Sequence, residues 1–353
     1  MKTLTVAFDS ISYPIHIESG CLARLGELIR TVYQGKAAVI TDDNVDGFYG
    51  KTVMNSLQQS GVEACKHVFP HGEKSKCNDR LQEIYTFLSE QHINRGDFII
   101  ALGGGVTGDL AGFAAATYMR GIGLVQVPTS LLAQIDSSVG GKVAIDMPFG
   151  KNLVGAFYHP KLVVIDPACL DTLPQRFYND GMAEAIKYGC IKSKPLFDAI
   201  VSQTISREDL IYQCVSIKRD IVAVDANDTG LRMLLNFGHT LGHAIEKYYQ
   251  FSAYTHGEAV AIGMVLMTRF SEQSGTTRPG TSLQLVQAVQ QYQLPSQVPI
   301  GDLQALLPLL QQDKKNIGKT LHIVLLREIG EGIIVPTVDF LTEFRKSLGK
   351  VGL

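Results

Sequence analysis

FIIALGGGVTGD, residues 98–109, decides the fold, because a run of typical buried-strand residues leads directly into a glycine-rich turn. Gly103, Gly105 and Gly108 fit the spacing G-x-G-x-x-G, and a run of small residues follows them. Without a Cβ, these positions let the backbone approach a pyrophosphate, whose charge is stabilised at a helix N-terminus. The strand–turn–helix context favours a dinucleotide site over the alternative, a tight turn that only packs a helix on a sheet.

Strands and helices alternate through the first half of the chain, which predicts a largely parallel sheet covered by helices. A hairpin is expected before this alternation, at Thr3–Phe8 and Tyr13–Ile17. Buried strands are expected at Ala37–Ile40, Phe98–Leu102, Leu124–Val127 and Leu162–Ile165. Helical periods lie between them at Asp46–Gln59, Asp79–Gln91 and Gly108–Tyr118.

The second half is mostly helical and begins after Asp166–Asn179, a stretch with two prolines and no clear period. The expected helices are Gly181–Ile191, Arg207–Val224, Leu231–Tyr249, Gly257–Ser274 and Thr281–Gln293. Strand character returns only at His322–Leu326 and Gly332–Val335. We therefore expect an α/β domain at residues 1–177 and a mainly helical domain at residues 178–353.

Composition excludes several classes of protein. The 353 residues are 45% hydrophobic, which suffices for two domains with proper cores. The formal net charge of −2 offers no general attraction to nucleic acid or to an anionic membrane. No apolar run approaches the roughly 20 residues that span a bilayer, and the six cysteines form no CxxC pair. We expect a cytoplasmic protein.

Five polar residues recur within the predicted helix Leu231–Tyr249, whose other residues are largely apolar. They are Arg232, Asn236, His239, His243 and Glu246. Their alternating spacing of four and three residues predicts one stripe on one helix face. Burying such a row is costly unless the side chains meet partners, which indicates a site.

A carboxylate and two imidazoles on three predicted helices form a candidate metal set: Glu184, His239 and His256. His256 begins an apolar, interior helix, whose positive end disfavours an imidazolium and so suits a neutral ligand. Glu184 lies one turn from Lys187 and Tyr188. Taken singly, each of the three is more often a structural hydrogen-bonding group, and the sequence alone leaves their convergence open.

Other polar residues have two interpretations. Asp42 and Asn44 follow a buried strand and could bind a nucleotide ribose or cap a helix. Lysines beside glycines at 140–142 and 150–152 allow close approach of an anion, although surface turns look the same. Further candidate cations are Arg120, Lys218, Arg232, Lys314 and Lys315.

Six blocks of the sequence closely resemble the 3-dehydroquinate synthase family and occur in the family's order. They are Gly103–Asp109, Pro128–Lys142, Gly150–Phe157, Gly181–Tyr188, Leu235–Glu246 and His256–Gly263. The resemblance implies a Rossmann-like NAD-binding α/β domain and a mainly α-helical metal-binding domain, joined by a cleft. It also implies a homodimer in which Arg120 reaches the site of the partner subunit.

The resemblance assigns residues to each part of the site. By motif position, Glu184, His239 and His256 look like ligands of a divalent metal, usually zinc or cobalt. The implied NAD contacts are Asp42, Asn44, Glu73, Lys76, Gly104, Gly105, Val106, Asp109, Thr129, Ser130, Lys142, Lys151, Cys169 and Thr172. The residues implied around the substrate are Asp136, Lys142, Asn152, Lys187, Lys218, Arg232, Asn236, His243 and Lys314. Ser130 stands where many members have Thr, and Cys169 where an aromatic or apolar residue is usual.

The implied substrate is a phosphorylated keto-sugar acid, 3-deoxy-D-arabino-heptulosonate 7-phosphate. In the implied reaction a substrate hydroxyl is polarised by the metal and oxidised by NAD⁺, which acidifies the neighbouring C–H. Phosphate is then eliminated, the hydride is returned, the ring opens and an intramolecular aldol step closes the carbocycle. The product is 3-dehydroquinate, an intermediate of aromatic amino acid biosynthesis, and the net redox change is zero.

Three rival interpretations remain at this point. A metal-dependent glycerol or alcohol dehydrogenase shares the glycine turn, but needs no cations for two anionic groups and usually has Asp in its metal set. A sibling cyclase would act on glucose 6-phosphate or sedoheptulose 7-phosphate, which lack the carboxylate that Lys218 and Arg232 suit. A regulatory nucleotide-binding module does not account for Glu184, His239 and His256.

Overall fold

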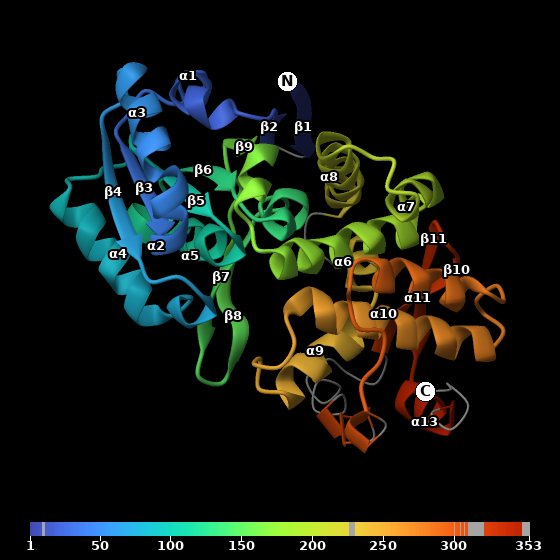
Figure 1. The fold of residues 1–353 in the computed structure, drawn as a ribbon. Coiled ribbons are helices and arrows are strands. Elements are labelled where there is room, and N and C mark those ends of the chain that lie inside the picture. Colours follow the sequence, from blue (N-terminus) through green and yellow to red (C-terminus); the bar gives the residue numbers. More distant parts are fainter. Residues whose placement is uncertain are drawn as a thin grey trace. The chain divides into compact units, whose positions relative to one another are not determined.

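Residues 98–109 form the predicted strand and helix, β5 (Phe98–Gly103) and the start of α5 (Gly105–Thr117), in the computed structural model (Figure 1). The sheet around β5 has seven strands in the order β1-β2-β9-β6-β5-β3-β4. β5 pairs in parallel with β3 (Ala37–Asp42) and β6 (Gly123–Pro128). The other strands are β1 (Lys2–Phe8), β2 (Ile11–Ile17), β4 (Ala64–Phe69) and β9 (Leu162–Ile165). The predicted antiparallel hairpin and parallel sheet are both confirmed.

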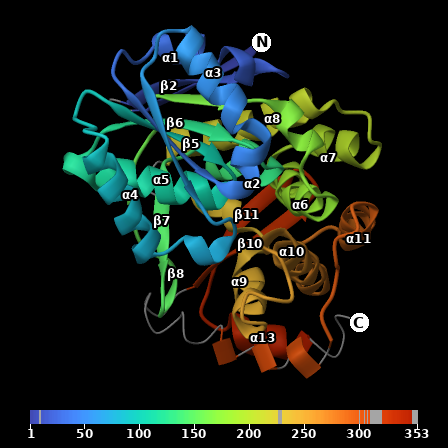
Figure 2. The ribbon, with the colours of Figure 1, turned by 60° about the vertical axis from the view of Figure 1, so that its left-hand side comes forward.

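Two hydrophobic cores form because successive side chains of a strand point to opposite faces of the sheet. Ile99 and Ala101 of β5 pack with α4 (Asn78–Glu90), α5 and β7 (Lys142–Met147). Phe98, Ile100 and Leu102 face the other way, toward α1 (Leu25–Arg30) and α3 (Lys51–Gln59). Helices therefore cover both faces, as Figures 1 and 2 show.

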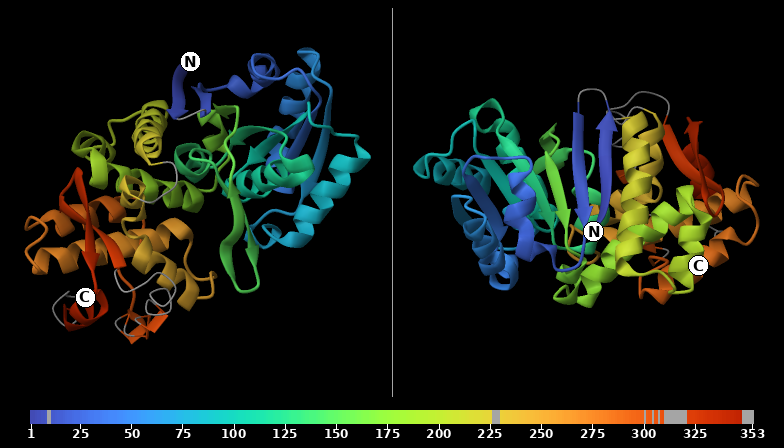
Figure 3. Two further views of the ribbon diagram at one scale, coloured as in Figure 1. Left: turned by 180° about the vertical axis from the view of Figure 1, so that it is seen from behind. Right: turned by 90° about the horizontal axis from the view of Figure 1, so that it is seen from above.

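The structure describes residues 1–8, 11–225, 230–299, 301–303, 305–306, 308–309 and 321–347. These fall into two compact units: residues 1–178 with 207–223, and residues 179–206 with 224–353. Helix α8 (Arg207–Val224) thus belongs almost entirely to the first unit, whereas the sequence placed it in the second domain. The reason lies in polar contacts with the N-terminal hairpin, since Lys2 pairs with Asp209 and the Ser19 N–H donates to Glu208. Figure 3 shows α8 alongside β1 and β2.

The second unit is built mainly from helices. These are α6 (Gln175–Lys192), α7 (Lys194–Val201), α9 (His239–Tyr248), α10 (His256–Gln273), α11 (Thr281–Gln291) and α13 (Phe340–Ser347). A two-stranded sheet of β10 (Leu321–Glu328) and β11 (Glu331–Thr337) joins them. The predicted fold class, an α/β unit and a mainly helical unit, is confirmed. Among the residues described, no helix has both the length and the apolar character to cross a bilayer.

Several elements differ from the sequence prediction. Helix α6 begins at Gln175, inside the stretch expected to be irregular. The hairpin of β7 and β8 (Gly150–Phe157) was not predicted, because its glycines and its largely exposed β8 obscure the strand pattern. The predicted helix Leu231–Tyr249 is two helices, a 3₁₀ turn η7 (Leu231–Asn236) and α9.

Further short elements lie between these strands and helices in the first unit. They are η1 (Cys21–Arg24), α2 (Asp43–Val45), η2 (Asp46–Gly50), η3 (Glu73–Ser75), η4 (Tyr118–Arg120), η5 (Ala133–Ser137) and η6 (Pro167–Asp171).

Candidate active-site residues in the two units

Three neighbouring strands of the first unit end together beside the glycine turn. β3 ends at Asp42, β5 at Gly103 and β6 at Pro128, and the parallel register sets these ends at one edge of the sheet. The Thr129 N–H donates to the Gly103 carbonyl at 2.9 Å, which fixes the two loops against each other. The carboxyl edge of a parallel sheet, where neighbouring strands connect to opposite sides, is the usual place for a nucleotide.

The glycine turn leaves the backbone without side chains at the N-terminus of α5. Gly104 is the N-cap, and a Cβ built on Gly104 would lie 3.4 Å from the Ser130 hydroxyl oxygen. A Cβ on Gly105 would lie 3.4 Å from the Ser137 hydroxyl oxygen. A side chain at either position would therefore contact a hydroxyl group, and glycine keeps the backbone bare where a pyrophosphate would meet the N–H groups of the first helical turn.

Asp42 serves as a helix cap in addition to its place at the sheet edge. Its Oδ1 accepts from the Val45 N–H at 3.0 Å, and its Oδ2 accepts from the Thr107 hydroxyl at 3.2 Å. The capping alternative is therefore confirmed for Asp42, and Asn44 is exposed beside it. Two further candidates, Cys169 and Thr172, contact Tyr49, whose hydroxyl lies 3.0 Å from the Cys169 carbonyl and 2.5 Å from the Thr172 hydroxyl.

A buried lysine connects the glycine helix with the β7–β8 hairpin. The Lys76 ammonium lies 2.5 Å from an Asp109 carboxylate oxygen and 2.5 Å from the Asn152 side-chain oxygen. Burial alone would lower the pKa of Lys76, but the Asp109 carboxylate and other nearby acids outweigh it and raise the pKa. Lys76 is therefore a charged group at neutral pH. Lys151 also faces this segment, with its ammonium 3.3 Å from Glu73.

The remaining candidates of the first unit lie in three places. Lys218 of α8 is buried, and its ammonium donates to the Asp136 carboxylate in an ion pair. Lys142 begins β7 and is exposed. Arg120 is also exposed and has a φ of 68°, directly after Met119 with a φ of 50°. Two consecutive non-glycine residues in this left-handed region are rare and mark local strain.

In the second unit, Glu184, His239 and His256 converge. Glu184 is fully buried on α6, and its Oε1 lies 3.6 Å from Nε2 of His239 and 3.7 Å from Nε2 of His256. Three ligands held about 2.0–2.1 Å from one tetrahedral ion stand roughly 3.3 Å apart. The two distances from Glu184 are close to this value, and all three ligand atoms lie within 4.8 Å of one another, so the set could hold a divalent cation. A carboxylate with two imidazoles also leaves a position open for a substrate oxygen.

Both imidazoles are oriented through their second nitrogen. Nδ1 of His239 lies 3.2 Å from the Phe237 carbonyl, an acceptor that requires the proton on Nδ1 and leaves Nε2 as the ligand. Nδ1 of His256 lies 3.5 Å from the Glu246 carboxylate, and Glu246 is buried. A carboxylate behind a histidine is the usual support of a metal-binding imidazole.

The electrostatic surroundings differ between the two histidines. Desolvation, with Lys187 as a further cause, holds the pKa of His239 well below its usual value. Burial also lowers the pKa of His256, but the carboxylates of Glu246 and Glu184 outweigh it and raise the pKa to about 9. In the absence of an ion, these carboxylates thus oppose the effect of the helix terminus on the imidazole. A divalent cation between the same carboxylates would compete with that proton.

The predicted stripe breaks at Gly238. This glycine has a φ of 81°, and a Cβ on it would lie 2.5 Å from Met264 Cγ and 2.7 Å from the Val260 carbonyl oxygen. His239, His243 and Glu246 keep their helical spacing on α9. Arg232 and Asn236 lie before the break, where Arg232 is buried and Asn236 is exposed, so the single stripe of five residues is wrong. His243 itself is exposed, and its ring centre lies 5.4 Å from that of His239.

Two supporting features were missed from the sequence. Asp180 accepts a hydrogen bond from the Gly257 N–H at 2.5 Å and so ties α6 to the start of α10. Thr255 and Glu258 form a reciprocal capping box around His256, and the S/T-x-x-E spacing could have revealed it.

The lysines predicted for this part of the site differ in what the structure shows of them. Buried Lys187 contacts Glu184 from the same helix. Lys314 and Lys315 lie outside the described residues.

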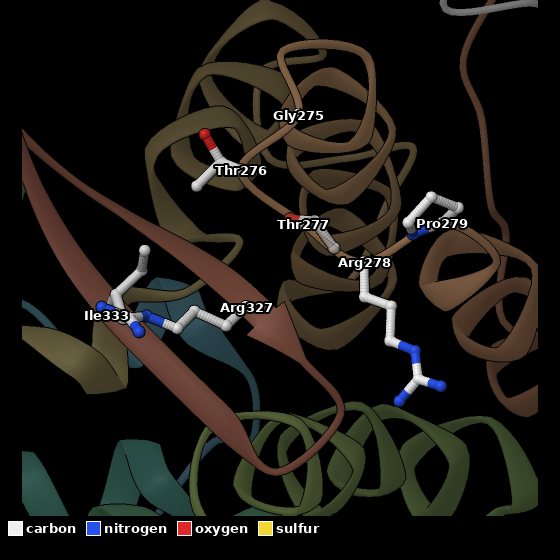
Figure 4. Close-up of a pocket in the computed structure, with 7 residues that line it drawn as sticks. All are labelled: Gly275, Thr276, Thr277, Arg278, Pro279, Arg327 and Ile333. Atoms are coloured by element: carbon white, nitrogen blue, oxygen red, sulfur yellow. The ribbon is translucent and has the colours of Figure 1, made fainter.

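A surface pocket in the second unit contains none of the candidate residues (Figure 4). It lies between the loop after α10 and the β10–β11 sheet, and two arginines line it. Arg278 lies 2.9 Å from Glu328 and Arg327 lies 3.5 Å from Glu331. Since carboxylates already balance both charges, and the two guanidinium groups point apart, the pocket offers no evident anion site.

Comparison with known proteins identifies the family. The family model for the N-terminal part of 3-dehydroquinate synthase matches residues 66–180, and the model for the C-terminal part matches residues 181–316. The chain belongs to the 3-dehydroquinate synthase family. It is 49% identical to the 3-dehydroquinate synthase of Clostridium beijerinckii over 350 residues, which cover 97% of this chain and all of that protein. The Streptococcus suis 3-dehydroquinate synthase is 42% identical over 96% of this chain and 98% of its own length. The chain is therefore an enzyme of the lyase class.

Solved structures show the same fold at lower identity. A 2-deoxy-scyllo-inosose synthase complexed with carbaglucose-6-phosphate, NAD⁺ and Co²⁺ has a TM-score of 0.87 at 24% identity, with both chains fully covered. A 2-epi-5-epi-valiolone synthase from Streptomyces hygroscopicus with NAD⁺ and Zn²⁺ bound also has a TM-score of 0.87, at 25% identity over 98% of each chain. A probable glycerol dehydrogenase from Sinorhizobium meliloti is more distant, with a TM-score of 0.64 and 14% identity over 96% of each chain.

Proposed function

We propose that this enzyme converts 3-deoxy-D-arabino-heptulosonate 7-phosphate to 3-dehydroquinate and phosphate, with NAD and one divalent ion, zinc or cobalt. The observation that carries the proposal is the convergence of Glu184, His239 and His256, in a chain 49% identical to a curated 3-dehydroquinate synthase. NAD is proposed because two structures of the same fold hold NAD⁺ with Co²⁺ or Zn²⁺. The test is whether many phosphates are released per NAD without build-up of NADH.

The dinucleotide is assigned to the edge of the sheet where β3, β5 and β6 end. The N–H groups at the start of α5 would bind its pyrophosphate, with Gly104 and Gly105 allowing close approach. Asp42 and Asn44 are assigned to the ribose. The further contacts proposed are Glu73, Lys76, Val106, Asp109, Thr129, Ser130, Lys142, Lys151, Cys169 and Thr172.

The divalent ion is assigned to Glu184, His239 and His256. When bound, it would supply Lewis-acid polarisation of a substrate hydroxyl during oxidation. The residues themselves hold the ligand atoms in place, since the Phe237 carbonyl and the Glu246 carboxylate face the second nitrogens of the two histidines. Buried Lys187 beside Glu184 is proposed to contact the substrate.

The substrate carries a phosphate and a carboxylate, and the cations are proposed to bind these groups and align the sugar chain. Orientation of this kind removes much of the entropic cost of the elimination and the ring closure. Arg232 suits the carboxylate because its planar guanidinium donates two parallel hydrogen bonds. The residues proposed around the substrate are Asp136, Lys142, Asn152, Lys187, Lys218, Arg232, Asn236, His243 and Lys314.

A homodimer in the cytoplasm is also proposed, with Arg120 acting in the partner's site. Support comes from the family motif, from the exposed and strained backbone at Met119 and Arg120, and from six free cysteines. Mixing Arg120→Ala with His239→Ala should restore about a quarter of wild-type activity. Random exchange makes half of the dimers hybrid, and each hybrid keeps one complete site.

The control for this experiment replaces the second partner with the double variant Arg120→Ala/His239→Ala, which should recover nothing. Differently tagged subunits that co-purify would show that exchange has occurred. Hybrid dimers without activity would then contradict the role of Arg120 across the interface.

A further inference from the structure

The β7–β8 hairpin is irregular beside Asn152, one of the residues proposed to contact the substrate. Ile145 pairs with Val154 and Met147 pairs with Gly150, so the extra residues of β8 bulge opposite Asp146. Asn152 lies within this bulge with a φ of 57°. Asparagine tolerates this left-handed conformation better than most residues, and bulges of this kind redirect a side chain.

Asp146 holds the bulge from the opposite strand. Its Oδ1 accepts from the Asn152 N–H at 2.9 Å. Its own N–H donates to the Lys76 carbonyl at 2.7 Å, next to a short bridge between Asp146 and Cys77. The backbone of Asn152 is thereby fastened to the segment that precedes α4.

Lys76 holds the side chain of Asn152, whereas Asp146 holds its backbone. An ammonium group only donates hydrogen bonds, so the Asn152 atom 2.5 Å from Lys76 Nζ must be the carboxamide oxygen. The carboxamide NH₂ therefore points away from Lys76. Because Asn152 is exposed, that NH₂ presents two donors to a ligand.

We propose that Asp146 is a positioning residue, which acts with Lys76 to hold the Asn152 NH₂ toward an oxygen of the substrate. The bound group is of the acceptor class, a hydroxyl, carboxylate or phosphate oxygen, because the held carboxamide offers donors only. The inference rests on the proposed function, since it takes Asn152 as a substrate contact. Asp146 itself touches neither the substrate nor the dinucleotide in this account.

Two substitutions at Asp146 separate positioning from folding. Asp146→Ala removes the acceptor of the Asn152 N–H and should lower kcat/KM for the heptulosonate phosphate by about 10- to 30-fold. Asp146→Asn keeps an oxygen acceptor and should stay within about threefold of wild type. Exposed Asp79→Ala on α4 is the matched control. The dissociation constant for NAD should be unchanged in all three.

A double-mutant cycle tests whether Asp146 acts through Asn152. Once Asn152→Ala has removed the carboxamide, adding Asp146→Ala should cost less than about a further twofold. Fully multiplicative losses, or an Asp146→Asn variant as damaged as Asp146→Ala, would overturn the proposal.

A measurement without turnover distinguishes this idea from the proposed function. Amide hydrogen exchange in peptides covering residues 146–154 should be faster in Asp146→Ala and unchanged in Asp146→Asn. If the wild type releases no phosphate from the heptulosonate phosphate, the proposed function fails, while exchange still tests the hold on Asn152. Equal exchange in all three proteins would refute that hold.

Discussion

Replacing His256 with Ala should abolish metal binding and activity together. Zinc or cobalt affinity should fall on the order of 1,000-fold, because one of three protein ligands is lost. The activity should fall at least as far, since polarisation of the substrate hydroxyl needs the ion. Metal content after dialysis, and the rise in Tm on adding zinc, measure the first effect independently of the second.

The control for His256→Ala is His322→Ala, which removes an exposed histidine from β10 of the same unit. It should retain metal, activity and the zinc-dependent rise in Tm. Stoichiometric metal persisting in His256→Ala would contradict the ligand assignment. Two ions bound per wild-type chain would also contradict a single site, since His243, Glu246 and His256 could also group around an ion.

Replacing Arg232 with Lys should reduce kcat/KM for the heptulosonate phosphate by about 30- to 150-fold, equivalent to about 2–3 kcal/mol. The charge is kept, but the two parallel hydrogen bonds to a carboxylate are lost. Arg232 is buried, and the Asp225 carboxylate holds its backbone N–H at 3.0 Å. The backbone that carries the guanidinium is therefore anchored.

The matched control is Arg327→Lys, the same change at a side chain paired with Glu331 on the β10–β11 sheet. Its kcat/KM should be unchanged, and the affinity of Arg232→Lys for inorganic phosphate should equal that of wild type. Tm of both variants separates a folding defect from a binding defect. An Arg232→Lys enzyme within threefold of wild type would remove the argument for a carboxylate at this residue.

The buried parts of the fold were predictable because their sequence patterns are strong. β3, β5, β6 and β9 are apolar runs buried on both faces, and each was found within two residues of its bounds. β4 escaped prediction because five of its six residues are only partly buried or exposed, which weakens the pattern. Helix α8 was placed correctly in sequence but in the wrong domain, since only its contacts with β1 show where it packs.

The candidate site shows the limit of periodicity. Heptad spacing predicted one helix through Arg232 and Glu246, but Gly238 takes up a left-handed conformation where Met264 leaves no space for a Cβ. The convergence of Glu184, His239 and His256 depends on how α6, α9 and α10 pack, and no local pattern encodes that. Asp146 could not be singled out either, because its role arises from the register of β7 and β8.

The central claim is a cyclisation with no net redox change, and it is tested by following phosphate and absorbance at 340 nm in the same reaction. Enzyme, zinc and a catalytic amount of NAD are mixed with the heptulosonate phosphate, and parallel reactions contain glucose 6-phosphate, sedoheptulose 7-phosphate or glycerol. The account predicts many phosphates per NAD from the heptulosonate alone, no steady rise in NADH, and loss of the reaction with a chelator. NADH accumulating in proportion to glycerol consumed, with no phosphate released from the heptulosonate, would contradict it.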